Sequence, residues 1–250
     1  MKRTKIKVIP CLDDLLRQRV AFHEAGHAAG IYLNNKARQL SPVIFNIVFK
    51  ATIRETDGRS FQSIHGDCLA RVEGGRLIEP LPNFIHNVAS GITAHNEPEE
   101  PFSDLYKAIF EADIINLLIG PLAEAKYIAN IDNELFSRQL FNMNALNFYG
   151  GESDIAKVNE YFQSCSADEK QNEQKLNALF NEAFDFVNND AHWQAITQLV
   201  IHMLASRSER MDCEEIVSQL DHAMANYKDR RGLERRHVYG PLKFKKSDLG

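Results

Sequence analysis

Hydrophobic positions follow a helical spacing over most of this chain. The first such segment runs from about residue 13 or 14 to residue 33 or 34, with acids at its start and an asparagine pair at its end. Gly120 and Pro121 should kink or divide the longest segment, residues 103–129. Further helices are predicted from the same periodicity over residues 153–162, 174–187, 192–205 and 212–227.

Residues 41–95 have a different pattern, which indicates strands and loops. Residues 42–53 are rich in β-branched and aromatic side chains and precede a turn sequence, so they predict a strand. Residues 68–81 predict a second strand, broken at a glycine pair, and the acidic, proline-rich residues 95–102 predict an exposed connection. The expected fold class is therefore α+β, predominantly α-helical, with a small β-sheet beside the first helix.

The end of the chain departs from the helical periodicity. Residues 227–250 are basic and are expected to form a flexible tail behind one domain of residues 1–226. Hydrophobic residues make up 44% of the chain, enough to fill a core, and charged residues 25%. The net charge of -5 gives no reason to expect nucleic acid as the main partner.

Neither the cysteines nor the apolar stretches of the chain suggest secretion or a membrane anchor. The basic first ten residues are not followed by the apolar run of a secretory signal. The longest uncharged stretch, residues 191–206, is too short to span a bilayer. We expect a cytoplasmic protein without a transmembrane segment, whose four separated cysteines are reduced thiols: Cys11, Cys68, Cys165 and Cys213.

The first predicted helix carries a string typical of hydrolytic zinc sites, His23-Glu24-Ala25-Gly26-His27. Because His23 and His27 are four residues apart, they lie on one helix face and can bind one tetrahedral metal ion. Glu24, next to the first ligand, can serve as the general base toward a zinc-activated water. The alternative is a chance match on a buried helix, and we favour the zinc interpretation.

A catalytic zinc needs a third protein ligand, with water in the fourth position. The metzincin class is excluded, because Leu33 stands where that class has its next histidine. Spacing alone does not choose among the five remaining candidates, which are His65, His86, His95, Glu124 and Asp154.

Four segments resemble, in order, blocks of the FtsH family of ATP-dependent zinc peptidases. They are VAFHEAGHAAGIYL, IINLLIGPLAEAKY, GGESDIAKVNEY and MDCEEIVSQL, scattered over residues 13–225. The first block is highly specific and the later ones are moderately so. The resemblance implies an FtsH-peptidase-like helical domain with Asp154 as third ligand and Glu24 as base. It also implies that Glu124 accepts a hydrogen bond from a ligating imidazole.

Both acids have simpler explanations as well. Asp154 could be an acid in the first turn of a helix, favoured there by the helix dipole. Glu124 could be a solvated helix residue. The chain also departs from the family: Pro121 and Leu122 replace its usual Arg-Ala, and the sheet region lacks its Pro-Arg-Gly turn. No glycine is followed by lysine, so the family's phosphate loop is missing, and we expect neither its ATPase module nor its membrane anchor.

The expected function is a zinc-dependent endopeptidase that acts on unfolded or peptide substrates without an ATPase of its own. Such an enzyme would cleave polypeptides alone, or with a separate unfoldase or as a homo-oligomer. An extended peptide could add to an edge strand within residues 43–53. The alternative is a zinc-binding but proteolytically inactive interaction or regulatory module. The missing ATPase motor and the basic tail favour this alternative.

Overall fold

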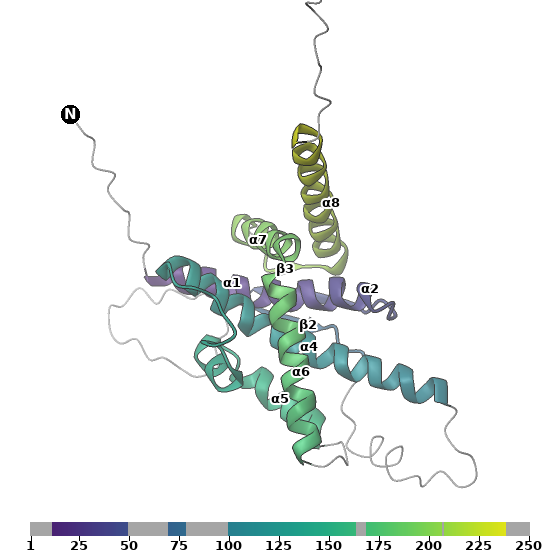
Figure 1. Cartoon of the computed structure of the whole chain (residues 1–250). Coiled ribbons are helices and arrows are strands. Elements are labelled where there is room, and N and C mark those ends of the chain that lie inside the picture. Colours follow the sequence, from purple (N-terminus) through teal and green to yellow (C-terminus); the bar gives the residue numbers. More distant parts are fainter. Residues whose placement is uncertain (1–11, 50–69, 79–99, 164–168, 207, 239–250) are drawn as a thin grey trace, which may run out of the picture.

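The structure, a computed structural model, describes residues 12–49, 70–78, 100–163, 169–206 and 208–238 (Figure 1). Helices make up most of this part, and one small antiparallel sheet of three strands accompanies them. The predicted fold class, α+β with helices predominating, is confirmed. Among the described residues, we find no helix with the length and apolar character that crossing a membrane requires.

Two helices pack closely at the centre of the fold, α1 (Leu12–Ala29, purple in Figure 1) and α4 (Glu100–Asp132, teal). Their approach depends on small residues, because a Cβ at Gly26 would lie 2.8 Å from the Cβ of Ala123 and 2.9 Å from the carbonyl oxygen of Ile119. The two backbones can therefore lie close enough for side chains of α1 to contact the backbone of α4.

The first helix does not end at its asparagine pair, as the sequence predicted. It continues through a π-helical turn, η1 (Gly30–Asn34), into α2 (Asn35–Ala37). Both asparagines are buried, and both are hydrogen-bonded to the side chain of Asn116 in α4, at 2.9 and 3.0 Å. A partner from another helix thus bonds to one atom of each amide, Nδ2 of Asn34 and Oδ1 of Asn35, which would otherwise favour a helix end, while Nδ2 of Asn35 has no hydrogen-bond partner among the described residues.

The sheet has the strand order β2-β1-β3, with β1 (Phe45–Phe49) in the middle and antiparallel to both neighbours. The predicted strands correspond to β1 and to β2 (Ala70–Gly74), which ends at two glycines of positive φ. The third strand, β3 (Arg210–Met211), was not predicted, because two residues carry no periodic signal.

Within the described residues, β1 is the central strand of the sheet and not the edge strand that was expected within residues 43–53, and the pairing of a peptide there stays a prediction. One side of β1 pairs with β2 along its whole length, and the other pairs with β3. Residues 50–53, and the predicted exposed connection at residues 95–99, lie outside the described part of the chain.

The helix α4 runs without a break through Gly120 and Pro121, so these residues do not divide it. Proline removes one hydrogen bond from the helix, which costs roughly 3 kcal/mol in an exposed helix interior. Here Leu118, Ile119 and Leu122 are fully buried around it. Packing on both sides of Pro121 holds the helix together where its local sequence disfavours it.

Three further helices occur where periodicity predicted them, α5 (Glu152–Gln163), α6 (Glu169–Asn188) and α7 (Asp190–Ala205). The 3-10 helix η2 (Met143–Tyr149), which was not predicted, precedes α5. The last helix, α8 (Cys213–Val238), extends beyond the predicted end at Tyr227 and reaches away from the other helices (Figure 1).

Residues 228–238, which belong to the predicted flexible tail, are helical, and the flexibility of the tail stays a prediction. Lysine, arginine and glutamate favour helix, and the extension elongates a helix already nucleated by its packed first half. Residues 239–250 lie outside the described part, and the domain boundary at residue 226 stays a prediction.

Candidate metal centre

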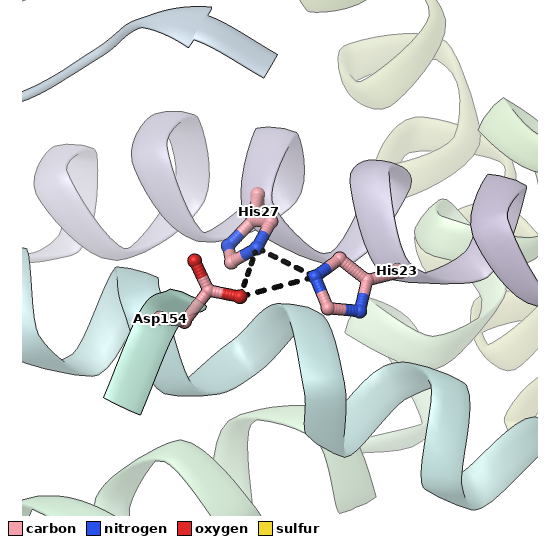
Figure 2. Close-up of side chains that lie close together, drawn as sticks. All are labelled: His23, His27 and Asp154. Carbon is pink, nitrogen blue, oxygen red and sulfur yellow. Dashed lines mark hydrogen bonds and ion pairs between the residues drawn. The ribbon is translucent and has the colours of Figure 1, made fainter. Parts of the chain in front are cut away.

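Three side-chain atoms converge between α1 and α5 (Figure 2). The Nε2 atoms of His23 and His27 lie 3.1 Å apart, and Oδ2 of Asp154 lies 3.2 Å from the first and 3.4 Å from the second. All three residues are less than 10% exposed. Both imidazoles come from α1, as the four-residue spacing predicted, and Asp154 reaches them from the first turn of α5.

The other ring nitrogen of each histidine faces oxygen atoms. Nδ1 of His23 is 3.2 Å from Oε2 of Glu124 and 3.2 Å from the carbonyl oxygen of Tyr149. Nδ1 of His27 is 2.9 Å from the carbonyl oxygen of Asn116. Because these oxygens accept hydrogen bonds, Nδ1 is the donor in both rings. In the neutral imidazoles, each Nε2 therefore presents a lone pair to the cluster.

Such a cluster of lone pairs fits a bound cation. Two imidazole nitrogens and a carboxylate oxygen that meet at 3.1–3.4 Å repel one another unless a proton or a metal ion lies among them. Zinc binds such ligands at about 2.0–2.2 Å in a tetrahedron, whose edges are then about 3.3–3.6 Å. Two histidines with one carboxylate is also a ligand set of catalytic zinc sites. The residues present therefore fit zinc in type, number and spacing.

The charges around the cluster favour a cation as well. Burial lowers the pKa of His23, but hydrogen bonds to Asp154 and Glu124 outweigh it and hold this pKa well above its usual value. Burial raises the pKa of Asp154, but the two histidines outweigh it and hold this pKa well below its usual value. The site thus keeps its carboxylate ionised and draws positive charge to the imidazoles.

Glu24 lies beside the cluster on α1 and faces the sheet. Its Oε2 accepts a hydrogen bond of 2.6 Å from the backbone N–H of Val72 in β2, and the residue is 6% exposed. Within the described residues, Oε1 of Glu24 has no hydrogen-bond donor. The sheet therefore lies beside the motif helix, as predicted, and fixes the orientation of this carboxylate.

Glu124 is buried against His23 and is not a solvated helix residue. Its Oε2 faces Nδ1 of His23, as the resemblance implied, and its Oε1 accepts a hydrogen bond of 2.8 Å from Nε of Arg19. Burial raises the pKa of Glu124, but His23 and then Arg19 outweigh it, so this pKa lies below its usual value. Glu124 is thus an anion that fixes the His23 ring.

Glycines let the backbone approach these side chains. A Cβ at Gly150, whose φ is +68°, would lie 3.1 Å from both Oε2 of Glu124 and Nδ1 of His23. A Cβ at Gly120 would lie 2.3 Å from Nε2 of His27. The turn before α5 and the middle of α4 therefore require glycine to form the walls of the site.

The structure decides among some of the sequence candidates. Asp154 joins the two histidines, and Glu124 contacts one of them from outside the cluster. The other candidates, His65, His86 and His95, lie outside the described residues.

Sequence reasoning missed several groups that surround the site. The backbone oxygens of Asn116 and Tyr149 and the N–H of Val72 carry no sequence signal, since every residue has them. Arg19 did have a signal, because it precedes His23 by four residues and so shares the face of the ligands.

Comparisons of the chain with protein-family models, with curated proteins and with solved structures found no match. The resemblance to the FtsH family thus stays a prediction that rests on the four segments quoted above. The case for function rests on the side chains around the cluster.

Proposed function

We propose that this protein is a zinc-dependent endopeptidase in which His23, His27 and Asp154 hold the metal. The observation that carries this proposal is the convergence of three buried ligand atoms, with Nδ1 of each histidine against a hydrogen-bond acceptor, so that each ring in its neutral form directs the Nε2 lone pair into the cluster. The neighbouring Glu24 distinguishes the site from a purely structural one, which would have no use for a base and usually has four cysteine or histidine ligands.

The chemistry divides between the metal and the protein. When bound, zinc would polarise the scissile carbonyl and lower the pKa of a water molecule toward neutrality. Oε1 of Glu24 would accept the proton from that water and pass it to the leaving amine. The hydrogen bond from Val72 to Oε2 would hold the carboxylate in one orientation while Oε1 carries the proton.

The partners of the two histidines would keep the site in order. Glu124 and Asn116 accept the Nδ1 protons and so direct Nε2 toward the metal position. The carboxylate of Glu124 also makes His23 more basic and thereby a stronger ligand. Such supporting hydrogen bonds fix the tautomer and the ring orientation before any substrate arrives.

The substrate class follows from the burial of the site. Its ligands and Glu24 are each less than 10% exposed, so a scissile carbonyl must enter on an extended chain. A stable fold cannot present its backbone in this way without local opening. We therefore propose that the substrates are peptides or unfolded proteins, cleaved without ATP or delivered by a separate unfoldase.

A peptidase assay tests the proposal. Purified protein is incubated with fluorogenic peptides and casein, with and without a chelator, and zinc is then added back. We expect cleavage that the chelator abolishes and zinc restores, with Glu24→Gln as the inactive control. Cleavage that persists in the Glu24→Gln variant would point to a contaminating protease or to another site.

One observation favours a second function, that of a zinc-binding but proteolytically inactive interaction module. The carboxylate of Glu24 is buried and already accepts a hydrogen bond from β2, which could restrict it as a base. Wild-type protein that binds one equivalent of zinc but cleaves no peptide in a broad library would support this alternative over the peptidase.

A further inference from the structure

Arg19 connects the segments that build the metal centre. It lies on α1, one turn before His23, and its side chain is 33% exposed. Its Nε donates to Oε1 of Glu124 at 2.8 Å, and its Nη2 donates to the carbonyl oxygen of Phe148 at 3.3 Å. One guanidinium thus joins α1 to α4 and to η2.

The contact with Glu124 bears directly on His23. Glu124 uses one carboxylate oxygen for Arg19 and the other for Nδ1 of His23, and its own side chain is 5% exposed. A buried carboxylate oxygen that loses its donor is left unsatisfied, so the carboxylate turns toward another donor or toward water. The turned carboxylate would no longer orient the His23 ring.

The contact with Phe148 bears on the other ligands. The next residue, Tyr149, offers its carbonyl oxygen to Nδ1 of His23, and Gly150 packs against both His23 and Glu124. This turn leads directly into α5, whose first turn carries Asp154. Arg19 therefore holds the segment that brings the carboxylate ligand to the two imidazoles.

We propose that Arg19 is a positioning residue of the metal centre, acting through Glu124 and through the turn that precedes α5. The inference rests on the proposed zinc site. Arginine suits this role because its planar guanidinium presents several N–H groups in fixed directions, so two acceptors on different elements can be bound at once. A lysine has one ammonium on a flexible chain and would keep the charge near Glu124 without the fixed bridge.

Zinc affinity, measured by competition with a chromophoric chelator, tests the proposal. We expect Arg19→Ala to weaken zinc binding by about 10- to 100-fold, the range typical of groups that support metal ligands. Arg19→Lys should recover part of that loss. Arg17→Ala is the matched control, since Arg17 is exposed on the same helix, and it should bind zinc like the wild type.

Two further measurements separate positioning from a general loss of structure. If Arg19 acts largely through Glu124, the double variant Arg19→Ala/Glu124→Gln should bind zinc about as well as Glu124→Gln alone. The visible spectrum of the Co²⁺-substituted protein reports the geometry around the metal. It should change in Arg19→Ala and remain that of the wild type in Arg17→Ala.

The outcomes distinguish this inference from the proposed function. Zinc binding by the wild type with equal affinity in Arg19→Ala would overturn the inference and leave the zinc site intact. Fully additive losses in the double variant would overturn the route through Glu124. If the wild type binds no zinc, both proposals fail. Should Arg19→Ala not fold, Arg19→Lys provides the same test, and an unchanged affinity and Co²⁺ spectrum in it would overturn the role of the bridge.

Discussion

The imidazole of His27 lies directly against the Cα of Gly120, so closely that a Cβ on this glycine would be 2.3 Å from Nε2 of the ring. This contact joins the motif helix α1 to the middle of α4 at the nitrogen that points into the cluster. The identity of a residue on α4 thus limits the position of His27, a proposed metal ligand on α1.

We expect Gly120→Ala to destabilise the fold by about 1–3 kcal/mol and to weaken zinc binding severely, because the new methyl must displace the His27 ring. Gly30→Ala is the control, since it adds a methyl between η1 and α4 that meets the flexible end of Ile119 at 2.9 Å and Oδ1 of Asn116 at 3.2 Å but no atom of His27 within 4 Å among its nearest contacts. Thermal unfolding and zinc titration measure both effects. Normal zinc binding by Gly120→Ala would show that the ring has room to move.

Glu24→Gln should keep zinc and lose hydrolysis. The amide preserves the shape of the side chain and can still accept the hydrogen bond from Val72 through its oxygen. It cannot take up a proton, and removing a general base lowers the rate by about two to four orders of magnitude. Metal content and peptide cleavage are measured on the same preparation. Loss of zinc from this variant would mean that Glu24 is a ligand.

Asp154→Ala should weaken zinc binding far more than alanine at any of the three histidines outside the described residues. Asp154 supplies one of three converging ligand atoms, and a cluster of two imidazoles alone binds zinc poorly. Elemental analysis after dialysis compares the variants. If alanine at His65, His86 or His95 removes the metal instead, the ligand set proposed above is wrong.

Stability should rise with pH through the titration of Lys126. Burial lowers the pKa of Lys126 to about 8, and the negative charge of Asp190 offsets only part of this. Between this value and the usual pKa near 10.5, the unfolded chain binds more protons than the folded one, so raising the pH favours the fold.

The variant Lys126→Met isolates this contribution. The stability of the wild type relative to the variant should increase by about 2–3 kcal/mol between about pH 7 and about pH 10. Urea denaturation at the two pH values measures it. A difference that stays constant with pH would mean that Lys126 remains charged, through its hydrogen bonds to Val187 and Asn188.

The sequence by itself determined those features that depend on local spacing. The helical periodicity predicted the helices, and the four-residue interval of His23 and His27 placed both imidazoles on one face. Local patterns suffice here because a helix repeats every 3.6 residues, whatever packs against it. The resemblance to a peptidase family also named Asp154, although spacing alone left five candidates open.

Tertiary structure decided everything that depends on contacts between distant residues. Only packing shows that Asp154 meets the histidines, and that α4 continues through Pro121 because buried neighbours support it. Only pairing shows that β1 is central, because the short strand β3 covers its other side. Asn34 and Asn35 are typical of a helix end, but here Asn116 forms one hydrogen bond with each of them from another helix. The physical reason is the same in each case: a partner remote in sequence outweighs the local preference.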